Sequence, residues 1–71
     1  MSDDPDKKKI DGWFYDANQP HEVSYFLKKM EDAHPSKSKE QVKKAIASCC
    51  DSIKPSEGRT KLEECVKKKL A

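Results

Sequence analysis

The sequence predicts a small all-α protein, in which three amphipathic helices pack together and an extended aromatic segment lies across them. Three observations lead to this fold class. The chain has 71 residues, the size of one small domain. Apolar residues recur at helical spacing in three separate stretches. Each stretch has a single narrow apolar stripe, which is buried only when the helices pack on one another.

The N-terminal part of the chain is expected to contribute little regular structure. Residues 1–9 are rich in Asp and Lys and are predicted to form a flexible charged tail, so that residues 10–71 make up the single domain. The segment from Ile10 to Tyr15 ends in three consecutive aromatic residues, which have high strand propensity. Because no partner strand exists, we expect an extended segment that lays Ile10 and Trp13 against the helices.

The first predicted helix begins near Asn18, a good N-cap residue. It ends at His34, because the residue before Pro35 is disfavoured in the helical region. Its apolar face has the spacing i, i+3, i+4, i+7 and is formed by Val23, Phe26, Leu27 and Met30. This stripe is the most regular and the bulkiest in the chain, so we predict that it forms the main part of the core.

Two more helices follow. Ser38 and Gln41 form a capping-box pattern at the start of the second, which should end near Cys50. The third follows Pro55, with Ser56 as N-cap or with a later start near Thr60, because Gly58 weakens the first turn. The apolar stripe of the second helix is Val42, Ala45, Ile46 and Cys49. That of the third is Leu62, Cys65, Val66 and Leu70.

The three cysteines, Cys49, Cys50 and Cys65, are odd in number, and two of them are adjacent. The N-terminal residues lack the apolar core of a signal peptide, and no apolar run approaches the ~18 residues of a membrane span. We therefore expect free thiols, a cytoplasmic location and no membrane association. On their apolar stripes, Cys49 and Cys65 should behave as small hydrophobic residues.

Catalytic and metal chemistry are not expected. His21, His34 and the three cysteines are potential metal ligands, but they lack the short paired spacing of a zinc site. Cys50 with either histidine could form a nucleophilic pair, yet the sequence shows no third group to orient it. The two glycines lie far apart and form no phosphate-binding loop. We therefore predict a protein that is not an enzyme and has no cofactor or metal.

The charge distribution is asymmetric. Residues 1–35 have a net charge of −3, and residues 36–71 have a net charge of +5. The conservative interpretation is that helical pairs such as Glu63–Lys67 lie on solvated faces. The alternative is that the lysines and the arginine of the second half, from Lys37 to Lys69, neutralise phosphates of a nucleic acid. The residues predicted for that contact are Lys39, Lys43, Lys44, Lys61 and Lys68.

Aromatic residues offer a second kind of contact. Trp13 is predicted to cover the helical core, while the neighbouring aromatics cannot all be hidden on one side of an extended chain. The predicted partner contacts are Phe14, Tyr15, His21 and Tyr25. The role favoured by the sequence is a non-enzymatic, cytoplasmic protein-interaction module that binds an unknown protein or a second copy of itself. The alternative is a nucleic-acid-binding protein that uses the basic second half.

Several motifs along the chain also have a family likeness. They are Asp3-Asp4, Ile10, His21-Glu22-Val23, Tyr25-Phe26, Ser38 leading to Val42, Ala45-Ile46, Val66 and Leu70. With these motifs the chain resembles the family of short bacterial proteins grouped as domain of unknown function 3606. The resemblance implies a small helical bacterial protein, and it implies no activity, because none is assigned to that family.

Overall fold

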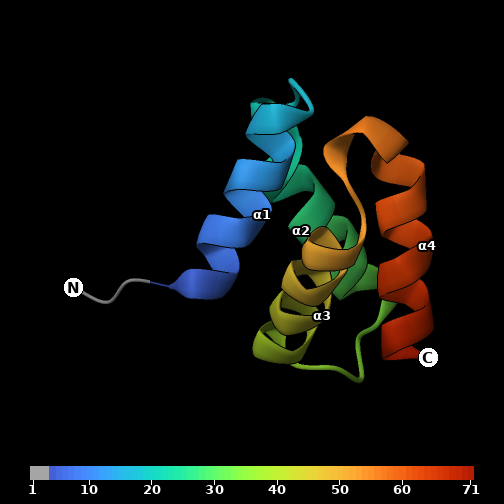
Figure 1. Ribbon diagram of the computed structural model, residues 1–71. Helices are drawn as coiled ribbons and strands as arrows, with labels where there is room; N and C mark the ends of the chain where they lie inside the picture. The colour runs from blue at the N-terminus through green and yellow to red at the C-terminus, as the bar shows by residue number, and fades with distance from the viewer. Residues whose placement is uncertain (1–3) are drawn as a thin grey trace.

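The computed structural model describes residues 4–71 as an all-α domain (Figure 1). Four α-helices and two short 3-10 helices make up the described part, which contains no strand. In chain order they are α1 (Pro5–Asp16), η1 (Pro20–Glu22), α2 (Val23–Ala33), α3 (Lys39–Ser52), η2 (Pro55–Glu57) and α4 (Arg59–Leu70). The all-α prediction is confirmed, but the predicted count of three helices is wrong.

The additional helix is α1, which replaces the predicted extended aromatic segment. Asp4 caps it, since its side chain accepts hydrogen bonds from the backbone N–H groups of Asp6 and Lys7. Residues 5–9, expected to belong to a flexible tail, form its first turns, while residues 1–3 lie outside the described residues. Ile10, Trp13 and Phe14 have the spacing i, i+3, i+4, and all three are buried. Burial of this stripe outweighs the strand propensity of the aromatic run.

Asn18 has a different role from the predicted N-cap. Its φ of 61° lies in the left-handed region, which asparagine tolerates better than most residues. This conformation reverses the chain directly after α1, and the backbone N–H of Gln19 donates to the carbonyl oxygen of Phe14 at 2.8 Å. The next segment therefore starts with the short η1, and α2 begins at Val23.

The other helix boundaries follow the sequence more closely. Ser38 and Gln41 form the predicted capping box of α3. The later of the two predicted starts for the last helix is confirmed, because α4 begins at Arg59 and Gly58 precedes it with a φ of 95°. A positive φ at this position suits glycine, which has no Cβ to clash.

The third α-helix occupies the centre of the domain. Figure 1 shows α3 between α1 on one side and α4 on the other, and α2 also packs on it. The predicted stripe of α3 is fully or almost fully buried, and the stripes of α2 and α4 face it. The core consists of Ile10, Trp13, Phe14, Val23, Phe26, Met30, Val42, Ala45, Ile46, Ala47, Cys49, Leu62, Val66 and Leu70.

An aromatic cluster joins α1 to the rest of this core. The ring of Phe14 lies 5.2 Å from that of Trp13 and 5.4 Å from that of Phe26, measured between centroids. Trp13 also donates a hydrogen bond from Nε1 to the backbone carbonyl of Ile53, with a length of 2.8 Å. Its apolar ring is buried and its polar group has a partner, as a stable core position requires.

A disulfide links Cys49 of α3 to Cys65 of α4, with the two Cα atoms 5.9 Å apart. The prediction of free thiols is therefore wrong for these two residues and holds for Cys50. The reason is tertiary, since the cysteines lie on the apolar stripes of two helices that pack face to face. No helix within residues 4–71 is long and apolar enough to cross a membrane.

The position of Phe26 in the aromatic cluster leads to a stability prediction. Phe26→Ala should lower the free energy of unfolding by about 3–5 kcal/mol, because it removes a fully buried ring from a thin core. The neighbouring Tyr25→Ala should change it by less than about 0.5 kcal/mol, since that side chain is exposed. Urea denaturation followed by circular dichroism measures both values. Equal free energies of unfolding for the two variants would show that Phe26 is not at the centre of the core.

Candidate anion-binding face

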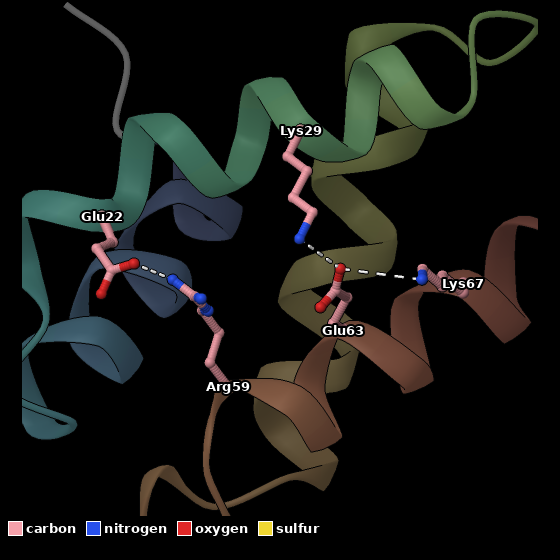
Figure 2. A network of polar contacts seen from close by, with 5 residues as sticks. All are labelled: Glu22, Lys29, Arg59, Glu63 and Lys67. Atoms are coloured by element: carbon pink, nitrogen blue, oxygen red, sulfur yellow. Dashed lines mark hydrogen bonds and ion pairs between the residues drawn. The ribbon is translucent and has the colours of Figure 1, made fainter.

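One side of α4 is occupied by ion pairs with the segment containing η1 and α2 (Figure 2). The guanidinium of Arg59 pairs with the carboxylate of Glu22, and Lys29 pairs with Glu63 at 3.0 Å. Lys67 lies 3.9 Å from the same Glu63 carboxylate. Arg59, Glu63 and Lys67 are four residues apart along α4 and therefore share one side of the helix. This side of α4, which we call the Glu63 seam, is a contact between elements of the domain and is not open to a partner.

Glu63 is the centre of this seam. Its hydrogen bond from Lys29, together with the charge of that lysine, lowers the pKa of the Glu63 carboxyl below its ordinary value of 4.5. The same pairing raises the pKa of Lys29 above its ordinary value. Both groups are therefore charged at neutral pH.

Two more ion pairs connect α1 to α3. Lys43 pairs with Asp4, the carboxylate that caps α1, and Lys9 pairs with Asp51 at 2.7 Å. The hydrogen bond from Lys43 also lowers the pKa of the Asp4 carboxyl. Lys43 was among the predicted nucleic-acid contacts, but in the structure its ammonium group holds the start of α1 against α3.

A different set of cations surrounds two adjacent surface hollows on the α3–α4 hairpin. One hollow is lined by Ile53, Lys61, Glu64, Cys65, Lys68 and Lys69. The other is lined by Lys37, Gln41, Lys44, Ala45, Lys69 and Leu70. Lys69 lines both hollows, which are therefore neighbours on the surface. We call the five lysines, Lys37, Lys44, Lys61, Lys68 and Lys69, the basic face.

The basic face has a strong excess of positive charge. Glu64 is the single carboxylate among the residues that line the two hollows. None of the five lysines forms an ion pair with another residue between Asp4 and Ala71. Both hollows open widely to solvent, so the ammonium groups are accessible to a large anionic partner.

Tertiary packing brings this face together. Lys61 and Lys68 are seven residues apart and so lie on the same side of α4. Because α3 and α4 run in opposite directions (Figure 1), the end of α4 meets the beginning of α3. Lys69 is thereby placed beside Lys37 and Lys44, which lie more than twenty residues earlier in the chain.

The five predicted nucleic-acid contacts thus divide into three groups. Lys44, Lys61 and Lys68 belong to the basic face. Lys39 is exposed at the first residue of α3 but lines neither hollow, and Lys43 is paired with Asp4. Lys37 and Lys69 complete the face although they were not among the five. The sequence shows that these two residues are positively charged, but it does not show that they lie close to the other three lysines.

The predicted partner contacts are also divided. Phe14 is 0% exposed, so its prediction as a surface contact is wrong, because α1 turns its ring into the core. Tyr15 and Tyr25 are 66% and 62% exposed, and His21 is exposed in η1. Tyr25 lines a hollow along α2 with Lys28, Lys29 and Asp32, and Tyr15 is not part of that hollow. The structure therefore places the two tyrosines on separate helices and does not bring them into one site.

The remaining polar side chains form no evident reaction centre. Between Asp4 and Ala71, no group of three or more His, Cys, Asp or Glu side chains is arranged to hold a metal ion. The Cys50 thiol is half-buried, and burial together with the nearby Asp51 charge raises its pKa to about 12. This thiol is therefore protonated at neutral pH and is a poor nucleophile.

The Glu63 seam leads to a pH-dependence prediction. Because the pKa of folded Glu63 lies below 4.5, the ion pair stabilises the protein above that pH and is lost as the pH falls further. Between neutral pH and about pH 3, Glu63→Gln should lose about 2–4 °C less in Tm than the wild type loses. Thermal melts followed by circular dichroism measure the difference. The matched control is Glu31→Gln, which removes a carboxylate that has no ion-pair partner among the described residues and should follow the wild type. An identical slope for both variants would contradict the prediction.

Comparison with known proteins does not identify a relative of this chain. No protein-family model, curated protein or solved structure matches the chain. The basic face is therefore the feature of the molecule that indicates a function.

Proposed function

We propose that this protein is a non-enzymatic binding module that docks the phosphate backbone of a nucleic acid on the basic face. The observation that carries the proposal is the grouping of five lysines around two neighbouring hollows, both of which are lined by Lys69. Five like charges with one carboxylate among them repel one another in the unbound protein. A polyanion relieves that repulsion and releases its own condensed counterions, which favours binding.

Five of the ten cations outside the basic face form ion pairs, and the contrast with these five supports the assignment. Lys9, Lys29, Lys43, Arg59 and Lys67 all have carboxylate partners within the described chain. Four of those pairs lie at contacts between elements and tie the domain together, while Lys67 pairs with Glu63 within α4. The lysines of the basic face have no such structural task, and their charge is directed to solvent.

The face is suited to phosphates rather than to bases. No aromatic residue lines either hollow, so no platform exists there on which a base could stack. Gln41 lines one hollow, but its side-chain oxygen accepts the hydrogen bond of the capping box from the backbone N–H of Ser38. Lysine contacts a phosphate as a point charge and carries no sequence information by this contact. The proposed binding is therefore independent of sequence.

A protein-interaction module remains the second candidate, favoured by the exposure of Tyr15 and Tyr25. Exposed tyrosines combine a large apolar area with a polar tip and are common in protein interfaces. Each of these two lies singly on its helix, however, and single exposed aromatics are ordinary on protein surfaces. We also propose that the protein is cytoplasmic and is related to the short bacterial family that its sequence resembles. Both proposals are compatible with a nucleic-acid partner.

The proposal is tested by fluorescence-anisotropy titration of a short labelled DNA duplex. The affinity of the wild type should fall at least about tenfold between about 50 and 200 mM salt, and unrelated sequences should bind equally. The triple variant Lys44→Ala, Lys61→Ala, Lys68→Ala should bind at least about tenfold more weakly at low salt. The slope of log affinity against log salt should become shallower by about 2–3.

The matched control removes the same charge from elsewhere. Lys7→Ala, Lys8→Ala, Lys28→Ala changes three exposed lysines that have no ion-pair partner among the described residues. It should bind within about twofold of the wild type, because net charge alone acts weakly. An equal loss of affinity in both triple variants would show that net charge alone, and not the basic face, determines binding to the duplex. Absence of any duplex binding at low salt would rule out the proposal.

A further inference from the structure

The disulfide connects the two helices that form the basic face. Cys49 of α3 is 0% exposed, whereas Cys65 of α4 is only partly buried and lines one of the two hollows. Three lysines of the basic face line the same hollow as Cys65, namely Lys61, Lys68 and Lys69. Cys65 is thus the more exposed half of the bridge, and it lies within the proposed binding site.

The bridge matters to α4 because this helix has few other extensive contacts. It lies at the edge of the bundle and packs chiefly on α3 (Figure 1). Its contacts with η1 and α2 include the exposed and half-exposed ion pairs of Figure 2, which are individually weak. Without the covalent link, α4 would depend on the burial of Leu62, Val66 and Leu70 in a thin core. The relative position of the α3 and α4 lysines would then be less well fixed.

We propose that the Cys49–Cys65 disulfide is a redox latch for the basic face, opened by a dithiol reductant that attacks Cys65. This inference rests on the proposed function, because it describes the regulation of the same site. In the oxidised protein the bridge holds α4 against α3 and so keeps the five lysines in one arrangement. In the reduced protein α4 is loosened from α3, and binding to the nucleic acid becomes weaker.

The exchange is a two-electron reduction with a defined order of steps. One thiolate of the dithiol attacks Sγ of Cys65, the S–S bond breaks, and Cys49 leaves as a thiolate that takes up a proton from water. The second thiol of the reductant, as its thiolate, then attacks the reductant's own sulfur in the mixed disulfide. Cys65 is released as a thiolate, and the reductant ends as a cyclic disulfide. The lysines around Cys65 favour both the approaching thiolate and the Cys65 thiolate that is released.

The neighbouring Cys50 does not compete in this exchange. Burial raises the pKa of its thiol to about 12, so that almost none of it is thiolate at neutral pH. It therefore does not attack the adjacent bridge, and reoxidation restores the Cys49–Cys65 pair. A reversible bridge also agrees with a cytoplasmic protein, because cytoplasmic disulfides are usually transient and redox-sensing.

The experiment compares the oxidised wild type with the same protein reduced by dithiothreitol. Thiol titration of the protein unfolded in guanidinium chloride should find one thiol per chain before reduction and three afterwards. At a fixed low salt concentration, the reduced protein should bind the labelled duplex at least about fivefold more weakly. Cys65→Ser should bind like the reduced wild type with or without dithiothreitol, whereas Cys50→Ser should keep the full response. Equal affinity of the oxidised and reduced wild type would overturn the latch.

Two further readouts separate the latch from the proposed function. Amide hydrogen exchange of residues 59–70 should become at least about tenfold faster on reduction, with a smaller change in α1. Limiting glutathione should form its mixed disulfide on Cys65, as identified by peptide mass. If no form of the protein binds the duplex, the proposed function fails, and the latch is then judged by hydrogen exchange alone. Unchanged exchange in α4, or attack at Cys49 instead of Cys65, would overturn it even if the duplex binds.

Discussion

The burial of the apolar stripe of α3 is the constraint on which the rest of this domain depends. Every other α-helix packs on α3, and its side chains Val42, Ile46 and Cys49 are completely buried. A chain of this size has room for one such centre, and none of its helices could bury its own stripe alone. The capping box at Ser38 is therefore important beyond its local hydrogen bonds, because it sets where the central helix begins.

Charge in this protein is divided between structure and surface. Ion pairs connect α1 to α3 and connect the η1–α2 segment to α4. They lie at the edge of the thin core and add to the contacts between these elements. The basic face lies on the α3–α4 hairpin, and its lysines form no ion pair among residues 4–71. At its edge, Lys44 also lines a hollow beside the ion pair of Lys43 with Asp4. Such a division explains how a nearly neutral chain, with a formal net charge of +2, can have one strongly positive surface.

The Cys49–Cys65 bridge connects the stability of the fold to the proposed binding site. A small domain with a modest core gains proportionally more from a single cross-link than a large domain does. In this protein the cross-link joins the same two helices that supply the lysines. A change in its redox state would therefore alter the arrangement of the basic face before it affected α1 and its aromatic cluster.

The sequence by itself determined the all-α class, the three apolar stripes of α2, α3 and α4, and the capping box, because these are local and periodic properties. It did not identify α1 as a helix, since the strand propensity of an aromatic run was outweighed by the burial of Ile10, Trp13 and Phe14. The sequence also supplied the lysines, but only the antiparallel packing of α3 and α4 selected Lys37 and Lys69 and placed Cys49 against Cys65. Proximity between residues far apart in the chain is decided by how the helices bury their stripes, and no local pattern records it.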